Sequence, residues 1–159
     1  MLTRIKGYSL NDIKNSIRQF LDDASGSSDV RALAVGIVSG NQDKIAAVHD
    51  WIKQNVSYIS DPVSATGDIE LFISPIRMTK DYNTGKALGG DCDDMSILAT
   101  ALYRSIGIRA NVLLLDTGGM GLDHAVCKVY SEKLGHLMVD PSAPIPVGWS
   151  EQYFSEVEV

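Results

Sequence analysis

Three residues of the chain have the types and the placement that acyl transfer through a cysteine requires. Cys92 stands at the start of an expected buried helix, His124 opens one expected strand, and Asp140 closes the next. The reaction needs a thiol nucleophile, a base within hydrogen-bond reach, and a carboxylate that fixes the imidazole tautomer. Because the ends of antiparallel neighbours lie close together, the sequence predicts that these three residues meet and attack a peptide or amide carbonyl through a thioester.

Opposing influences act on the Cys92 thiol. The unpaired N–H groups and the dipole at a helix N-terminus favour a thiolate, whereas Asp91, Asp93 and Asp94 carry negative charge that raises a thiol pKa. The three acids have three explanations: they complement the helix N-terminus, Asp91 and Asp93 help to hold Ca²⁺, or they anchor a substrate amine. Zinc is disfavoured because the paired Cys or His spacing is missing. Apart from calcium, no cofactor is predicted.

Residues around Cys92 are candidates for binding the substrate and its oxyanion. Gly89 and Gly90 allow a substrate backbone to approach closely, and the N–H of Cys92 is a natural oxyanion donor. The second donor stays open. The candidates for oxyanion or substrate binding are Gly90, Asp91, Asp93, Asp94, Tyr58 and Gln54, with Asn55 and Asn83 as further amide donors.

The other cysteine and histidines have structural explanations. Cys127 points away from His124 in an alternating strand, which favours a core position. His136 is too far along its strand to be oriented by Asp140, so we expect it at the surface, and His49 flanks the apolar stripe of a helix. An alternative for Cys92 itself is a small buried residue at the first turn of a helix. His124 is therefore the candidate base.

The elements that position these residues are helices first and strands later. Helical spacing of apolar residues predicts an N-terminal helical hairpin, expected as an appendage to the core, and then a third helix. A short strand and a loose segment follow. The buried helix begins after Gly90, and three antiparallel strands come after it. The expected ranges are 9–23, 30–38, 42–55, 56–59, 61–90, 92–106, 108–115, 124–130 and 136–140. This order is typical of an α+β fold.

Length and composition predict one folded domain. The chain has 159 residues, 45% of them hydrophobic and 21% charged, with a net charge of −6. No run of Lys or Arg suits nucleic acid, and neither a signal peptide nor a membrane span is readable. Two cysteines suggest reduced thiols in the cytoplasm. We expect one domain over 1–159, with a helical extension at 1–40, a catalytic core at 44–140 and a tail at 141–159; the oligomeric state stays open.

Four segments resemble the transglutaminase-like superfamily in order, spacing and flanking residues. They are Gly90–Asp94, Met95–Ile108, Asp123–Ala125 and Val139–Pro141. The resemblance implies a papain-like fold, with Cys92 on a helix and His124 and Asp140 on adjacent strands. Val126 and Gly135-His136 depart from aromatic residues common in the family.

The resemblance extends to a subtype and to a class of reaction. Asp61-Pro62, Ser74-Pro75 and the Pro146–Trp149 tail resemble small bacteriophage or prophage members. If water is the second nucleophile, the enzyme is a protease or amidase; if an amine is, it is a transglutaminase. We expect hydrolysis of a peptide or protein substrate. The alternative is a non-catalytic phage structural or adaptor protein that keeps the fold.

Overall fold

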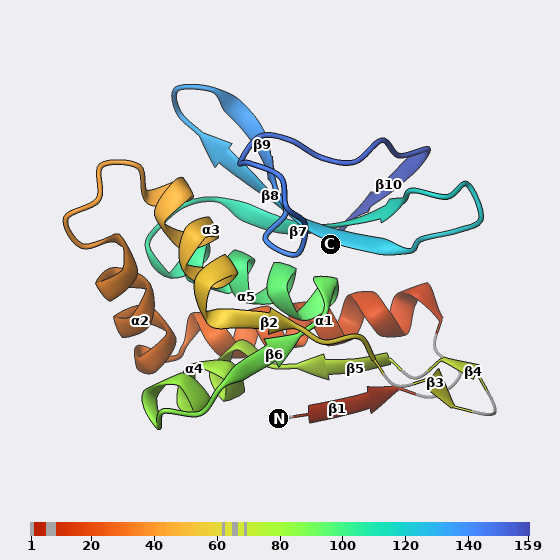
Figure 1. Cartoon of the computed structure of the whole chain (residues 1–159), viewed down its shortest axis with the longest axis horizontal. Helices are drawn as coiled ribbons and strands as arrows, with labels where there is room; N and C mark the ends of the chain where they lie inside the picture. Colours follow the sequence, from red (N-terminus) through yellow and green to blue (C-terminus); the bar gives the residue numbers. More distant parts are fainter. Residues whose placement is uncertain (1, 6–8, 62, 65–66, 69) are drawn as a thin grey trace.

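The fold has a sheet on one side and a layer of helices on the other, with smaller strand pairs beyond the helices (Figure 1). The computed structural model describes residues 2–5, 9–61, 63–64, 67–68 and 70–159. Helices packed on an antiparallel sheet confirm the predicted α+β class. Within the described residues, no helix has both the length and the apolar character needed to cross a membrane.

The main sheet contains four antiparallel strands in the order β10-β7-β8-β9. They are β7 (Ala110–Asp116), β8 (His124–Ser131), β9 (Gly135–Val139) and β10 (Ser155–Glu158). The first three confirm the predicted strands. The fourth strand, β10, lies in the segment expected to be a tail. Its residues are mostly exposed and acidic, so no apolar pattern predicts a strand there, and its order comes from pairing with β7.

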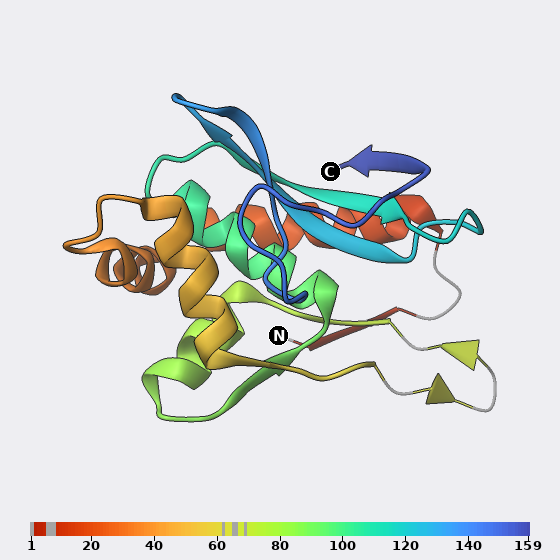
Figure 2. The same cartoon turned by 45° about the horizontal axis from the view of Figure 1, so that its top comes forward.

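Helix α5 (Cys92–Ser105) is the predicted buried helix, and it lies between the main sheet and the small strand pairs (Figure 1). Figure 2 shows the same arrangement from a second direction. The helix is capped at its start by Asp91 and is buried continuously from Asp94 to Tyr103. Gly107 follows its end with a left-handed φ of 81°, a common glycine position after a helix. Burial on several sides fixes the position of its first residue, Cys92.

The N-terminal helices pack into the same core as α5. They are α1 (Leu10–Ser25), α2 (Ser28–Val38) and α3 (Lys44–Asn55), close to the predicted ranges. Ser9 and Asp12 form a capping box at the start of α1. Ile17 and Val30 have no solvent exposure and join the core cluster. The hairpin is therefore packed against the rest of the chain and does not stand apart as an appendage.

The segment expected to be loose contains a further helix and short strands. Helix α4 (Pro75–Asn83) starts at Ser74, whose Oγ accepts a 3.2 Å hydrogen bond from the Arg77 N–H, and Pro75 occupies its first turn. A Ser-Pro start is a readable helix signal. Strand β6 (Leu88–Gly90) precedes α5 and pairs in parallel with β2 (Val56–Tyr58).

The remaining strands form two small antiparallel pairs. Strand β1 pairs with β5, and β3 pairs with β4. Their bounds are Leu2–Ile5, Glu70–Ile73, Val63–Ser64 and Gly67–Asp68. Pro62, part of the proposed phage-type pattern, lies outside the described residues.

Candidate active site

His124 and Asp140 meet where β8 begins and β9 has ended. Regular pairing of the two strands stops at Cys127 and Val139, so the next residue, Asp140, is free of the ladder and reaches His124. The Asp140 Oδ2 atom lies 2.6 Å from His124 Nε2. Asp140 is fully buried, and its Oδ1 accepts hydrogen bonds from the N–H of Ser142 at 3.1 Å and the Ser142 Oγ at 2.6 Å. With Nε2 held by Asp140, Nδ1 is the ring nitrogen left for proton transfer.

The Cys92 sulfur lies beside the backbone of the residue that follows His124. The N–H of Ala125 lowers the pKa of the thiol, and the thiol points toward Asp93 Oδ1 at 3.9 Å. Ser96, one turn further along α5, donates from its Oγ to the Ala125 carbonyl at 2.9 Å and fixes α5 against β8. The structure therefore brings the three segments together. Among the described residues, no hydrogen bond joins the Cys92 sulfur to the imidazole.

The electrostatics of the site favour a neutral thiol and raise the pKa of the imidazole. Burial raises the pKa of the Cys92 thiol, Asp93 and Asp91 raise this pKa further, and the Ala125 N–H opposes the rise. The expected stabilisation of a thiolate by the helix N-terminus is therefore outweighed. The hydrogen bond to Asp140 raises the pKa of His124 despite the opposing effect of burial.

The carboxylate of the pair stays ionised. Burial raises the pKa of Asp140, but hydrogen bonds from His124 and Ser142 outweigh it, and the pKa falls below its usual value. Asp140 can therefore hold Nε2–H in place and stabilise a positive charge on the ring. The arrangement can move a proton from sulfur to Nδ1 and later return it to a leaving group.

Asp91 and Asp94, two of the acids beside Cys92, accept hydrogen bonds from backbone N–H groups. Asp91 is the N-cap of α5, and its Oδ1 accepts from the N–H groups of Asp93 and Asp94 at 3.1 and 3.3 Å. Asp94 is buried, its carboxylate accepts from the N–H of Ile73 at 2.7 Å and of Asp91 at 3.3 Å, and burial raises its pKa to about 7. Asp93 is half-buried next to the sulfur. Over the described ranges, no group of three or more ligating side chains could hold a metal ion.

Asp91 also decides which backbone donor remains at the start of α5. Its side chain takes the N–H groups of Asp93 and Asp94, and its carbonyl takes the N–H of Met95 at 3.0 Å. The N–H of Cys92 is the one first-turn donor without a partner among the described residues. A donor next to the nucleophile is where an oxyanion would form.

Gly90 and Tyr58 lie opposite each other in the β2–β6 pair. A Cβ atom at Gly90 would lie 2.7 Å from the Asp94 Cβ and 3.0 Å from the Met78 Cε, so the glycine makes room for this internal packing, and a role in substrate binding stays a prediction. Tyr58 is 55% exposed. Burial raises the pKa of its hydroxyl, and the pairing with Gly90 places Tyr58 near the start of α5, at the edge of the site.

The amide candidates for the second oxyanion donor are spread over two helices. Gln54 is exposed on α3, and Asn83 is exposed at the end of α4. The Asn55 amide donates to the Trp51 carbonyl of its own helix at 2.8 Å. In the described part of the chain, no hydrogen bond links any of them to Cys92.

The other cysteine and histidines lie where they were expected. Cys127 is fully buried, it accepts a hydrogen bond from Thr100 Oγ1 at 3.2 Å, and burial raises its pKa to about 12. His49 is buried in α3, and His136 is exposed next to Tyr130. Ser142 is a site residue that sequence reasoning missed. An Asp followed two residues later by Ser is a readable turn signal.

A family comparison agrees with this arrangement. A model of the transglutaminase-like superfamily matches residues 31–141, a range that contains Cys92, His124 and Asp140. The chain belongs to the transglutaminase-like superfamily. The match also includes most of α2, in agreement with the packing of that helix in the core. Comparison with curated proteins finds no match.

Solved structures share the superfamily fold. A protein from Cytophaga hutchinsonii, provisionally named a cysteine protease, has 22% identity and a TM-score of 0.58, with 91% of this chain and 50% of that chain covered. A provisionally named protease from Parabacteroides distasonis has 15% identity and a TM-score of 0.58, over 82% and 26%. Calcium-bound LapG of Legionella pneumophila has 18% identity and a TM-score of 0.52, over 82% and 75%. The chain thus spans half of the Cytophaga protein and about a quarter of the Parabacteroides protein.

Proposed function

We propose that the protein is a cysteine-dependent enzyme that transfers the acyl group of a peptide or amide through a thioester on Cys92. The observation that carries the proposal is the 2.6 Å hydrogen bond between His124 and the fully buried carboxylate of Asp140. A buried carboxylate is costly unless it is well paired. The Asp140 carboxylate binds Nε2 of His124 and leaves Nδ1 available, and the half-buried Cys92 thiol lies at the same end of the sheet. This arrangement supports a catalytic role over a structural one.

The first half of the reaction forms the thioester. The Cys92 sulfur attacks the carbonyl carbon while its proton moves to Nδ1 of His124, and the carbonyl oxygen becomes an oxyanion. Asp140 stabilises the resulting imidazolium through Nε2–H. The tetrahedral intermediate then collapses, the C–N bond breaks, and Nδ1–H returns the proton to the leaving amine.

The second half releases the acyl group. His124 takes a proton from water, the oxygen attacks the thioester carbonyl, and the sulfur leaves and regains a proton from Nδ1. An amine in place of water gives an isopeptide bond by the same steps. Hydrolysis is the proposed outcome, because two of the relatives above are provisionally named proteases.

The oxyanion and the substrate bind around the start of α5. The N–H of Cys92 serves as the first oxyanion donor because the other first-turn N–H groups already have partners. For the second donor we favour the Tyr58 hydroxyl over the Gln54 amide, because Tyr58 pairs with Gly90, two residues before Cys92. Asp93 is placed to meet a substrate amine beside the sulfur. Asp91, Asp94 and Gly90 then support the site by capping and packing.

Calcium has no step in this mechanism. Asp91 uses its carboxylate to cap α5, and among the described residues no cluster of three ligating side chains accompanies it, whereas Ca²⁺ takes about 6–8 oxygen ligands. The LapG structure was determined with calcium bound, which is a property of that protein. The proposed mechanism therefore assigns no role to calcium, and calcium binding by Asp91 and Asp93 stays a prediction.

A mixture of peptides tests the proposed function. The wild-type protein and Cys92→Ala are incubated with it, and mass spectrometry looks for cleavage, replacement of an amide by a carboxylate, or cross-links that lose ammonia. We expect cleavage by the wild type alone, with Cys127→Ala as the active matched control. Equal products with Cys92→Ala would exclude the mechanism. A lack of any product would favour the non-catalytic adaptor.

Several features belong to the proposal as a whole. The partner is a peptide or protein, and neither nucleic acid nor a membrane has a role. A cytoplasmic location and a single domain over 1–159 stay predictions. The comparisons give no support to the phage or prophage type, which also stays a prediction.

A further inference from the structure

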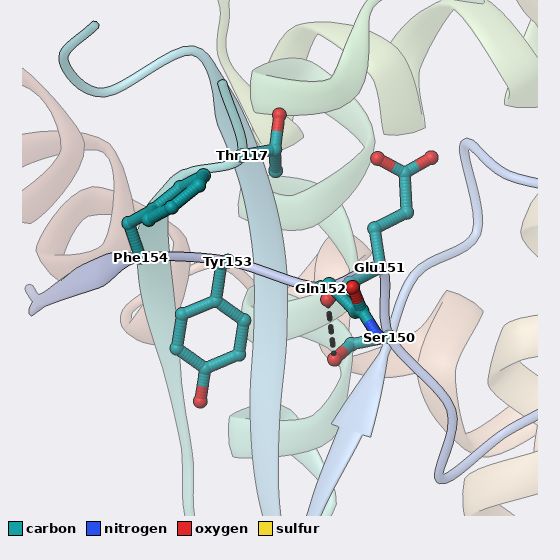
Figure 3. A pocket seen from close by; sticks show the side chains of 6 residues that line it. All are labelled: Thr117, Ser150, Glu151, Gln152, Tyr153 and Phe154. Atoms are coloured by element: carbon teal, nitrogen blue, oxygen red, sulfur yellow. Dashed lines mark hydrogen bonds between the residues drawn. The ribbon is translucent and has the colours of Figure 1, made fainter. Parts of the chain in front are cut away.

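A pocket of about 690 Å³ lies next to the start of β8, where no function has been assigned so far. Thr117, which follows β7, lines it together with the segment 150–154 that leads into β10 (Figure 3). The segment is tied to the sheet by a 2.8 Å hydrogen bond from the Phe154 N–H to the Asp116 carbonyl. Phe154 also lies against Gly119 in the turn between β7 and β8. The pocket is thus a fixed part of the sheet edge.

The pocket is adjacent to His124. Thr117 donates from its N–H and its Oγ1 to the carboxylate of Asp123, the residue before His124, at 2.8 and 2.9 Å. Leu115, two residues before Thr117, pairs directly with His124. The Glu151 charge adds to the rise in the pKa of His124 that Asp140 causes. The pocket and the candidate base therefore share one end of the β7–β8 pair.

The direction of proton transfer indicates which part of a substrate lies on the pocket side of His124. The acyl group is held by the Cys92 sulfur at the start of α5, whereas the leaving amine takes its proton from His124 and must lie next to the imidazole. A pocket next to His124, on the side of β7 and β10, therefore faces the leaving part of the substrate. In a peptide, this is the residue that follows the attacked carbonyl.

The lining of the pocket suits a long cationic side chain. Figure 3 shows the Phe154 ring and the Glu151 carboxylate on the same side of the segment as Thr117, with the Tyr153 ring on the other side. Glu151 is exposed, and within the described residues its carboxylate has no hydrogen-bond or ion-pair partner. The nearby carboxylates of Asp116 and Asp123 are occupied by N–H groups of the turn. Lysine and arginine combine an apolar stem with a charged end, and aromatic rings also attract their charge.

We propose that this pocket is the subsite for the first residue of the leaving group, and that Glu151 selects lysine or arginine there. The inference rests on the proposed acyl transfer at Cys92, because it uses His124 to define the leaving side. The net charge of −6 acts in the same direction, since it attracts a cationic peptide. Glu151 is a specificity residue in this view and takes no part in the bond changes.

The test reads the residue that follows each cut in a mixture of random peptides. Wild type, Glu151→Gln, Glu151→Lys and the control Glu132→Gln are compared, with the new amino termini read by mass spectrometry. Glu132 is exposed at the opposite end of β8. We expect the wild type and Glu132→Gln to prefer lysine and arginine over methionine by about fivefold, the size of an exposed ion pair. Glu151→Gln removes this preference, and Glu151→Lys reverses it toward acidic residues.

A pair of single peptides that differ only by lysine or methionine at this position separates binding from chemistry. The effect of Glu151→Gln on the lysine peptide falls mainly on KM, and the methionine peptide corrects for any change in His124. Cuts by the wild type that show no preference for basic residues, or a preference that survives Glu151→Gln, would overturn the subsite and leave the proposed function standing. Absence of any cleaved, deamidated or cross-linked peptide would overturn the proposed function itself.

Discussion

The exchange Asp140→Asn changes the charge behind His124 while keeping the shape of the side chain. In the wild type, Oδ2 accepts from His124 Nε2 and Oδ1 accepts from the N–H of Ser142. Because that N–H is a fixed donor, an asparagine keeps its oxygen there and turns its NH₂ group toward His124. The ring must then accept with Nε2 and carry its proton on Nδ1. This is the nitrogen that has to take the proton of Cys92.

The expected loss has two parts. A hydrogen bond to a charged group contributes about 1.5–3 kcal/mol, which corresponds to roughly 10- to 150-fold in rate. The wrong tautomer adds to this, and the equivalent exchange in a Ser-His-Asp triad lowers kcat about 10⁴-fold. We therefore expect kcat/KM to fall by at least about 10²-fold. The pKa of His124 should return toward its ordinary value, because the hydrogen bond to Asp140 is what raises it.

Hydrolysis of p-nitrophenyl acetate gives the rate, and ¹⁵N NMR of His124 shows which ring nitrogen carries the proton. Ser142→Ala is the matched control, because it removes only the 2.6 Å hydroxyl contact and keeps the N–H, so it should cost about fivefold. Circular dichroism confirms that each variant is folded. An Asp140→Asn protein within about threefold of the wild type, with the proton still on Nε2, would refute the reasoning.

Three further predictions follow from the site. The pKa values of His124 and Cys92 are both raised, so the reactive form of the pair has a neutral thiol and a neutral imidazole. We therefore expect kcat/KM to rise with pH as His124 loses its proton above pH 6.5, and then to stay level. A bell-shaped profile whose acid limb lies below about pH 5 would contradict this. Gly90→Ala should lower the free energy of unfolding by about 1–3 kcal/mol in urea, because its Cβ meets Asp94, whereas Gly36→Ala, with open space around it, should raise it by about 0.5–1 kcal/mol. EGTA should leave the rate unchanged. A loss of rate that added calcium restores would show that calcium takes part in the reaction.

The sequence predicts the parts of the fold whose apolar patterns are long. The periodicity of apolar residues predicts α1, α5 and the strands β7, β8 and β9. The order of these strands also predicts that His124 and Asp140 lie close together. Short elements are missed because their order comes from tertiary pairing. Strand β10 has one half-buried residue, and β6 is ordered by pairing with the distant β2, which matches the short strand expected at 56–59.

The chemistry of the site is only partly readable from residue types. The capping of α5 by Asp91 agrees with the expectation that these acids complement the helix N-terminus, whereas the hydrogen bond from the Ile73 N–H to Asp94 joins distant segments, which no local pattern encodes. The pKa of the Cys92 thiol is set by burial, which opposes the helix N-terminus that the sequence makes visible. Glu151 is distant from the other site residues in the chain, and only the path of the C-terminal segment brings it near His124.

Acetylation of Cys92 tests the central claim most directly. p-Nitrophenyl acetate needs no peptide specificity, so an acid-quenched reaction followed by proteolysis and mass spectrometry can locate the acyl group. We predict a hydroxylamine-sensitive acetyl thioester on Cys92, none on the buried Cys127, and formation slowed about 10²-fold or more in His124→Ala. Acetylation of Cys92 at equal rates in wild type and His124→Ala, or its absence from Cys92, would contradict the proposed cooperation of thiol and imidazole.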